Sequence, residues 1–350
     1  MSLGILYCGV DTLEVSFVGE LLADMPDVLD AAKARAQATD TPVPLKLGED
    51  TLYVQAKGLG KYAWVLSDHR MQVRVSRTSK GMPTVSIRLW ASSLATFGHV
   101  ALYREACGVV AHLGDIKPNA LSRIDLATDV QGFEFTDAHA ARIVCPASYR
   151  ATHKDGEGFT YQFGKGDVVV RVYRKDAELR AKKKLSYAKL WERVEHYEPE
   201  SPVLRVEVQL RGAVLNELNA RSVESAFAKL SSLYAFGLSW CELRVPTSDA
   251  TKTRWPVDIK WTVLAATWGV CQPEPRVRLA SRVESVERVL SRLCGALASL
   301  AAYSGQTDLE TTMEYALAAL EIHLKERKED FRGLVGVKSA RIGSDEEVAF

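Results

Sequence analysis

Arg123-Ile124-Asp125-Leu126-Ala127-Thr128-Asp129 is the stretch of the sequence from which the fold can be worked out. Side chains of a β-strand point alternately to the two faces of a sheet, so Ile124 and Leu126 would lie on one face and the aspartates on the other. Residues 170–175 and 204–211 follow the same alternation. We therefore expect three neighbouring strands with one apolar and one polar face.

A weak internal repeat extends this interpretation to the first part of the chain. Three pairs of segments match in the same order: residues 10–15 with 124–130, 73–77 with 170–174, and 83–89 with 202–208. The repeat predicts two related strand sets in one sheet. The first copy has Ser76 and Arg88 where the second has Tyr173 and Glu207, so a site built on these strands would survive in one half only.

Helical periodicity and turn residues assign the rest of the chain. We expect helices at residues 28–37, 97–113 and 137–143 over one face of the sheet, an amphipathic insertion at 184–195, and helices at 282–302 and 309–328. The predicted fold class is α+β: an antiparallel sheet with internally duplicated strand sets covered by helices, plus a C-terminal helical hairpin. The predicted divisions are 1–120 (degenerate first half), 121–272 (half that carries the candidate site), 273–332 (helical region) and 333–350 (flexible tail).

Composition excludes several classes of protein. The 350 residues are 47% hydrophobic and 25% charged, as in ordinary globular chains, and the longest uncharged apolar stretches, 230–241 and 261–271, are too short to span a bilayer. The N-terminus lacks the basic region of a secretory signal, so we expect a cytoplasmic protein with no membrane partner. Because 45 basic residues balance 44 acidic ones, any binding of DNA must be local.

The predicted polar face carries carboxylates, a tyrosine and cations. It comprises Arg123, Asp125 and Asp129 from the first strand, Arg171, Tyr173 and Lys175 from the second, and Arg205, Glu207, Gln209 and Arg211 from the third. The same alternation is typical of the solvated face of an antiparallel sheet, and that alternative stays open. Aspartate is a poor strand former, however, so two aspartates on one short strand favour a site.

Oxygen ligands on adjacent strands suit Mg²⁺ or Mn²⁺, whereas the seven histidines form no H-x-H or H-x-x-x-H pair that would favour zinc. A tyrosine becomes a nucleophile when a cation stabilises its phenolate, which fits phosphoryl transfer. Residues 171–184 carry a basic excess of five charges, a track suited to a polyanion. A lysine run after a strand is also typical of a solvated helix start.

The three motifs together resemble a known family. Residues 123–129, 170–175 and 204–211 are similar to the R-I-D-L-A-x-D, I-R-I-Y-x-K and R-x-E-x-x-L-R motifs of the Rep_trans replication initiators. These proteins are found on rolling-circle plasmids and filamentous phages and are related to relaxases of some conjugative elements. The resemblance implies a fold like that of the His-hydrophobe-His nickases without the histidine motif, with Tyr173 as nucleophile, Asp125 and Glu207 as metal ligands and Asp129 as a third candidate.

The activity that the resemblance implies is metal-dependent, site-specific nicking and closing of one DNA strand through a 5′-phosphotyrosine, which initiates rolling-circle replication. Arg171 and Lys175 would stabilise the charge that develops in the reaction. The expected DNA-binding residues are Arg123, Arg174, Lys182, Lys183, Lys184 and Arg205. Origin DNA, single-stranded at the nick, is the expected partner, and a host helicase and a second copy of the chain are further candidates. Two alternatives stay open: a conjugative relaxase with the same chemistry, and a non-catalytic DNA-binding regulator.

Overall fold

The structure is a computed structural model that describes residues 3–78, 81–183, 185–277, 286–327 and 330–336. The chain divides into two compact units, Met1–Val277 and Arg278–Phe350. The second unit contains α10 (Val286–Ser304) and α11 (Leu309–Arg327), which contact each other. The predicted start of the first C-terminal helix, residues 282–285, and the predicted tail from 337 onwards lie outside the described residues.

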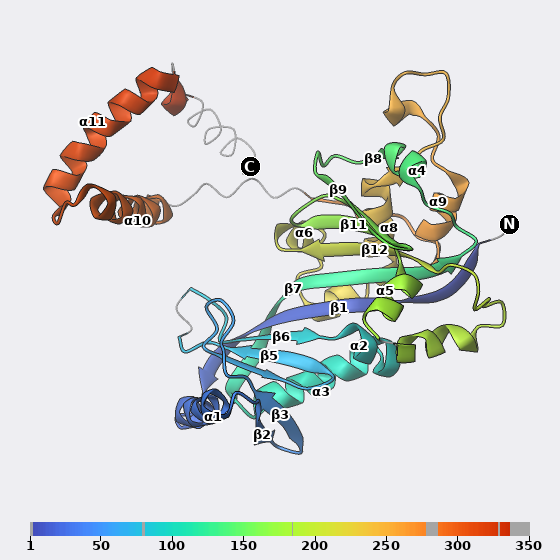
Figure 1. Ribbon diagram of the computed structural model, residues 1–350, viewed down its shortest axis with the longest axis horizontal. Helices are drawn as coiled ribbons and strands as arrows, with labels where there is room; N and C mark the ends of the chain where they lie inside the picture. Colours follow the sequence, from blue (N-terminus) through green and yellow to red (C-terminus); the bar gives the residue numbers. More distant parts are fainter. Residues whose placement is uncertain (1–2, 79–80, 184, 278–285, 328–329, 337–350) are drawn as a thin grey trace. The chain divides into compact units, whose positions relative to one another are not determined.

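One large antiparallel sheet forms the first unit (Figure 1). Over the described residues it has eleven strands, in the order β2-β3-β4-β5-β6-β1-β7-β12-β11-β10-β9. These strands are β1 (Gly4–Leu21), β2 (Val43–Leu47), β3 (Asp50–Val54), β4 (Trp64–Ser67), β5 (Met71–Val75), β6 (Val85–Leu89), β7 (Gly114–Gln131), β9 (Arg150–Asp155), β10 (Gly158–Phe163), β11 (Val168–Arg174) and β12 (Leu204–Arg211). A separate small sheet pairs β8 (Ile143–Val144) with β13 (Glu242–Leu243).

Apart from β2 at one edge, the strand order is symmetric about the central pair β1 and β7. Moving outward, β6 corresponds to β12, β5 to β11, β4 to β10 and β3 to β9. This order confirms the predicted α+β fold with duplicated strand sets. The residue-by-residue alignment of the repeat is wrong in one place. Arg171 lies opposite Glu207 in the second copy, so the alignment predicts that Arg74 lies opposite Arg88 in the first. The structure places Arg74 opposite Ser86 instead. A shift of two residues keeps every side chain on its face, so the alternation could not reveal it.

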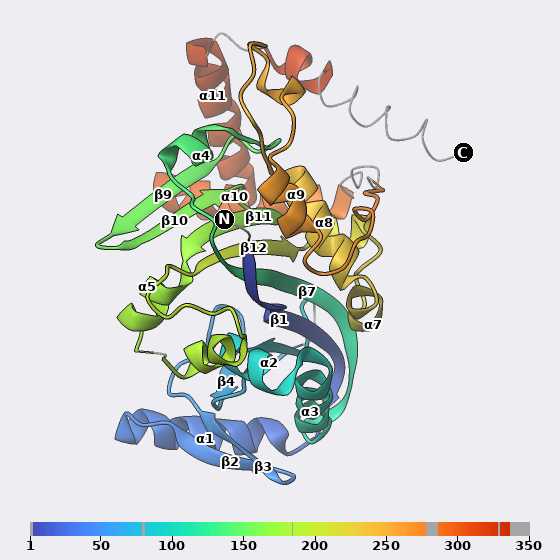
Figure 2. The same ribbon diagram turned by 90° about the vertical axis from the view of Figure 1, so that its right-hand side faces the viewer.

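The helices of the first unit divide between the two faces of the sheet. They are α1 (Met25–Thr39), α2 (Ala91–Phe97), α3 (His99–Ala111), α4 (Asp137–Ala141), α5 (Lys175–Ala181), α6 (Ala213–Glu217), α7 (Val223–Phe227), α8 (Leu230–Trp240) and α9 (Ile259–Ala265), with 3₁₀ segments η1 (Leu185–Arg193) and η2 (Lys252–Arg254). In Figure 2, α5 lies on one side of the β1–β7 pair and α7 and α8 lie on the other. Within the described residues, no helix has the length and apolar character needed to cross a bilayer.

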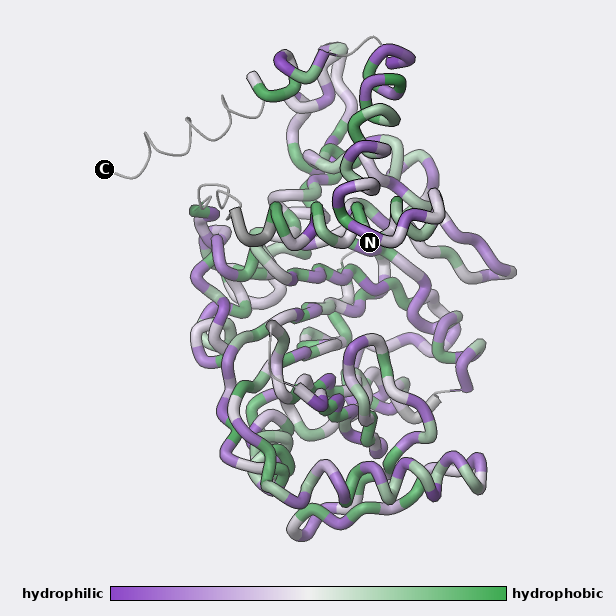
Figure 3. Tube along the Cα trace, turned by 90° about the vertical axis from the view of Figure 1, so that its left-hand side faces the viewer, coloured by the Kyte–Doolittle hydropathy of each residue, from purple (hydrophilic) through white to green (hydrophobic). Residues whose placement is uncertain are grey.

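The apolar face of the sheet forms the main core. Ile124, Leu126, Val170, Val172 and Val206 are fully buried there with side chains of α1, α3 and α8. Figure 3 shows the alternation of hydrophobic and hydrophilic residues along the strands. The predicted alternation is therefore confirmed, because each polar strand residue has its apolar neighbours on the opposite face.

The opposite, polar face is covered as well. A second apolar cluster of Leu6, Leu179, Tyr187, Trp191 and Val203, with Ala95 of α2 beside it, lies over this face. Leu6 belongs to β1, and the other four residues come from α5, η1 and the chain that leads into β12, so the segment predicted as an insertion acts as a cover. The alternative of a solvated face is wrong for this part of the sheet, because the polar residues beneath the cover are buried.

Two helix boundaries differ from those predicted. The helix expected at 97–113 is divided at Gly98, which adopts a φ of 79° and separates α2 from α3. The helix expected at 137–143 ends at Ala141, and Ile143 already belongs to β8. Lys175, predicted to share a strand face with Tyr173, is instead the first residue of α5, because Asp176 and Glu178 favour the first turn of a helix.

Candidate active site

A cavity of about 610 Å³ lies on the polar face beneath the cover. Its walls include Asp11 of β1, Asp125 of β7, Tyr173 of β11 and Glu207 of β12. A second cavity of about 460 Å³ shares Tyr173 and Glu207 with the first and continues along Phe159. The two strand sets and the helical cover therefore bring six of the predicted site residues to one cavity: Arg123, Asp125, Tyr173, Lys175, Lys182 and Glu207. Tyr173 lies where the two cavities meet.

Tyr173 and Glu207 are joined directly. The Tyr173 hydroxyl donates a hydrogen bond of 3.0 Å to Glu207 Oε2, and Arg171 Nη1 donates one of 2.8 Å to Glu207 Oε1. The antiparallel register sets this geometry, since Arg171 lies directly opposite Glu207. Arg171 also donates to Gln162 Oε1 at 3.0 Å and to Gln209 Oε1 at 3.2 Å, so its guanidinium is fixed from three sides.

The surroundings keep the Tyr173 phenol protonated. Burial, followed by the negative charge of Glu207, raises the pKa of Tyr173 well above its ordinary value, although Arg205 acts in the opposite direction. Lys175, predicted to stabilise the phenolate, has its Nζ 5.6 Å from the centre of the Tyr173 ring and donates to Glu178 Oε2 at 2.7 Å. Formation of the phenolate therefore needs a base at the hydroxyl, and Glu207 is the carboxylate that contacts it.

Asp125 is an almost completely buried carboxyl group. Arg123 donates to both of its oxygens, over 2.8 Å and 2.5 Å. Burial, with a contribution from the charge of Glu207, nevertheless raises the pKa of Asp125 to about 7. The predicted DNA-binding role of Arg123 is limited by this pairing, because its side chain is only 16% exposed and also lies near Glu14.

Asp125 and Glu207 fit a divalent cation in one respect. They line the same cavity, and their mutual repulsion contributes to the raised pKa of Asp125, which a cation between them would relieve. Mg²⁺ commonly takes one or two carboxylates and completes its shell with water and substrate phosphate. The described residues contain no cluster of three or more His, Cys, Asp or Glu side chains suited to a metal, so the predicted ligand set that included Asp129 is not assembled.

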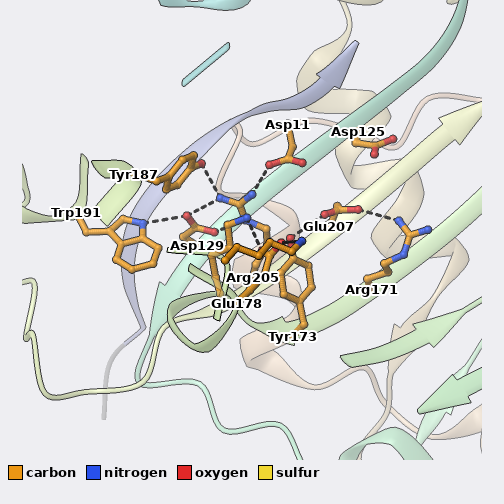
Figure 4. A network of polar contacts seen from close by, with 12 residues as sticks. Asp11, Asp125, Asp129, Arg171, Tyr173, Glu178, Tyr187, Trp191, Arg205 and Glu207 are labelled. Atoms are coloured by element: carbon orange, nitrogen blue, oxygen red, sulfur yellow. Dashed lines mark hydrogen bonds and ion pairs between the residues drawn. The ribbon is translucent and has the colours of Figure 1, made fainter. Parts of the chain in front are cut away.

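Asp129 and Arg205 belong to a separate buried network (Figure 4). Arg205 Nε and Nη2 donate to the two oxygens of Asp129 at 2.6 Å and 2.8 Å, and Trp191 Nε1 donates to Asp129 at 2.9 Å. Arg205 also donates to the Tyr187 hydroxyl at 2.6 Å and to Asp11. Both Asp129 and Arg205 are 0% exposed.

The network corrects two predictions. Asp129 is not brought together with the other two predicted metal ligands, because it is fully buried and does not line the cavity that contains Asp125 and Glu207. Arg205 cannot contact DNA, because its guanidinium is enclosed by its partners. The alternation placed both residues on the polar face but could not show that Tyr187 and Trp191 of η1 would cover them.

Ion pairs within the protein occupy part of the predicted basic track. Arg174 is bound to Asp176 through hydrogen bonds of 2.8 Å and 2.7 Å, and Lys182 donates to Glu178 at 2.6 Å. Lys182 and Lys183 are exposed, and Lys184 lies outside the described residues. Glu178, which the sequence analysis did not single out, lines both cavities; burial opposes its charge, but Lys175 and Lys182 outweigh this effect and hold its pKa at about 2.

Comparisons with known proteins reveal similarity to solved structures but to no family model. No protein-family model and no curated protein matches the chain. The solved structure of a rolling circle replication initiator protein from Geobacillus stearothermophilus is similar with a TM-score of 0.47 and 13% sequence identity, over 79% of this chain and 100% of that one.

Proposed function

We propose that this protein is a metal-dependent enzyme that nicks and closes one DNA strand and thereby initiates rolling-circle replication, with Tyr173 as the nucleophile. The observation that carries the proposal is the hydrogen bond from the Tyr173 hydroxyl to Glu207 inside a cavity that also contains Asp125. The biological role is proposed from the motifs that resemble those of replication initiators, which are residues 123–129, 170–175 and 204–211.

Glu207 acts as the general base in this proposal. Its Oε2 accepts the phenol proton while Tyr173 Oη attacks the phosphorus atom, and the bond from phosphorus to the 3′ oxygen breaks. The DNA on the 3′ side of the nick is then joined to Tyr173 through its 5′ phosphate, and the departing 3′ oxygen takes a proton from solvent and becomes a free hydroxyl. Closing the nick reverses these steps.

The cations at the site have different tasks. Arg171 holds Glu207 in position through its Oε1, which leaves Oε2 directed at the phenol. Asp125 and Glu207 are the residues that would hold Mg²⁺ or Mn²⁺, and such an ion would neutralise charge on the phosphate. Lys175 lies over the Tyr173 ring, with its Nζ 5.6 Å from the ring centre, and its positive charge favours the phenolate.

The two cavities that meet at Tyr173 support a single strand as the substrate. Each could take part of a nucleotide chain on one side of the scissile phosphate, and Phe159 in the second cavity offers a ring for base stacking. The exposed Lys182 lines this path, the exposed Lys183 follows it in the chain, and both suit backbone phosphates. Origin DNA is thus the proposed partner, and a host helicase and a second copy of the chain remain proposals.

Cleavage and rejoining of single-stranded DNA test the proposal. The full chain is incubated with Mg²⁺ and end-labelled oligonucleotides of randomised sequence, and cleaved and rejoined products are read on a sequencing gel. We expect both products for the wild type and neither for Tyr173→Phe. Binding of the oligonucleotides without cleavage under all metal conditions would contradict the proposal and favour the non-catalytic regulator.

A further inference from the structure

Cys145 and Cys241 lie opposite each other at the end of the small sheet. The register of β8 and β13 pairs Ile143 with Leu243 and Val144 with Glu242, and the next step of this antiparallel ladder pairs Cys145 with Cys241. Directly opposite residues have Cβ atoms about 4.5–5.5 Å apart, close to the separation in a disulfide. Both cysteines are free thiols in the structure, each influences the pKa of the other, and the Cys145 thiol donates a hydrogen bond of 3.4 Å to the Ala147 carbonyl.

The two thiols differ in reactivity. The interaction with the Cys241 thiol, and then the charge of Arg150, lower the pKa of Cys145 to about 6 against the opposing effect of burial. Burial raises the pKa of the Cys241 thiol well above its ordinary value. Cys145 is half-buried and therefore within reach of a small reagent, whereas Cys241 is buried. A partly exposed thiolate beside a second thiol is the usual arrangement of a redox-active pair.

Arg150 is held in place to favour the thiolate. Its Nη2 donates to the Ile143 carbonyl at 2.9 Å, and its guanidinium carbon lies 5.7 Å from the centre of the Phe163 ring. The charge of Glu242 raises the pKa of Cys241, and Arg244 donates a hydrogen bond to Glu242. Burial raises the pKa values of Cys8 and Cys107, so these two thiols lack the same activation.

We propose that Cys145 and Cys241 form a thiol modification site, which reacts with low-molecular-weight disulfides and closes into an intramolecular disulfide. The Cys145 thiolate attacks one sulfur of the small disulfide and releases the other as a thiolate. Cys241 then attacks Cys145 Sγ, loses its proton to solvent and releases the second small thiolate. The protein loses two protons and two electrons, and the small disulfide is reduced to two thiols.

The disulfide would close a loop that contains the proposed active-site strands. Strands β9 to β12, and with them Tyr173 and Glu207, lie between residues 145 and 241. Cross-linking the ends of this segment restricts its unfolded state, so the oxidised protein should unfold at a higher temperature than the reduced protein. This expectation does not depend on the proposed function.

Oxidised glutathione is the probe that tests the site. The native full-length protein is treated with it at pH 7, free thiols are alkylated, and tryptic peptides are mapped without reduction. We expect a peptide that links Cys145 to Cys241, its loss on reduction, and a higher Tm for the linked form. A stable glutathione adduct on Cys145 without the link, or a link that forms only in denaturant, would overturn the proposal.

Matched variants and a rate measurement complete the test. Cys145→Ser and Cys241→Ser should each abolish the link and the rise in Tm, whereas Cys271→Ser, at an exposed position, should change neither. Should a serine variant fail to fold, alkylation of the wild type still decides the matter. Cys145 should be alkylated at half its maximal rate near pH 6, and a rate at pH 6 no faster than that of Cys271 would contradict the proposal.

Discussion

The Tyr173 hydroxyl donates its proton toward Glu207 Oε2 over 3.0 Å, and both side chains are buried on the polar face of the sheet. A buried phenol with a raised pKa is inert by itself, and the adjacent carboxylate supplies the base that it needs. Substitutions at Glu207, Asp125 and Asp129 therefore separate the proposed catalytic pair from the residues that only support it.

Glu207→Gln should reduce the rate of single-strand cleavage by about 100-fold to 10,000-fold, the usual contribution of a general base. An amide cannot accept the phenol proton as a carboxylate does, although it keeps the shape of the side chain. Single-turnover cleavage of a labelled oligonucleotide measures the effect. Asp11→Asn is the matched control, since Asp11 lines the same cavity but bonds to Arg205. An equal loss in both variants would mean that the first strand set is not degenerate.

Asp125 should make the protein less stable as the pH rises from about 4 to about 7. Folding raises its pKa, so the folded state binds this proton more tightly than the unfolded state does. The resulting contribution to the free energy of unfolding is complete below the unfolded pKa of about 3.9 and is lost as the pH rises through the folded pKa of about 7. Urea unfolding at pH 5 and pH 8 should show a loss of roughly 2–4 kcal/mol in the wild type that is absent in Asp125→Asn. Asp137→Asn, at an exposed carboxylate, should follow the wild type. Parallel profiles for all three proteins would show that Asp125 stays ionised throughout.

Mg²⁺ or Mn²⁺ should stabilise the folded protein at pH 8 in the absence of DNA. A cation at one hundred times its Kd raises the free energy of unfolding by about 2.7 kcal/mol, which a thermal melt detects. Asp125→Asn and Glu207→Gln should each remove this rise in Tm, because each removes one of the two carboxylates. Asp137→Asn again serves as the control for unspecific binding of the ion to carboxylates. A full rise in Tm in both site variants would place the cation elsewhere.

Asp129→Asn should destabilise the protein by roughly 3–5 kcal/mol, because it removes the negative charge that balances the buried guanidinium of Arg205. The free energy of unfolding in urea measures this effect. Arg174→Gln breaks a more exposed pair with Asp176 and should cost about 1 kcal/mol or less. If Asp129→Asn kept wild-type stability but lost metal-dependent cleavage, Asp129 would be a ligand after all.

The sequence predicted the elements that depend on local alternation. Ile124 and Leu126 are in the core, Asp125, Tyr173 and Glu207 share one cavity, and the duplicated strand sets appear in the order of the sheet. These features follow from the period of two along a strand and from the repeat, both of which are visible in the residues themselves.

The rest depends on contacts between distant segments. Trp191 lies 62 residues from Asp129 in the chain, and nothing in the alternation of β7 indicates that its indole would cover that carboxylate. Tyr187 likewise encloses Arg205 from η1. Alternation shows which face a side chain takes but not what lies above that face, so buried structural charges and site charges look the same in the sequence.

The covalent adduct tests the central claim most directly. The full chain is incubated with Mg²⁺ and an oligonucleotide that it cleaves, labelled at the 3′ end. The protein is then denatured and digested for mass spectrometry. We predict that the 3′ label stays with the protein, that the Tyr173 peptide carries a 5′ phosphate-linked nucleotide, and that Tyr173→Phe forms no adduct while it still binds the DNA. An adduct on another tyrosine, such as Tyr161 or Tyr187, or cleavage by Tyr173→Phe at the wild-type rate, would contradict the account.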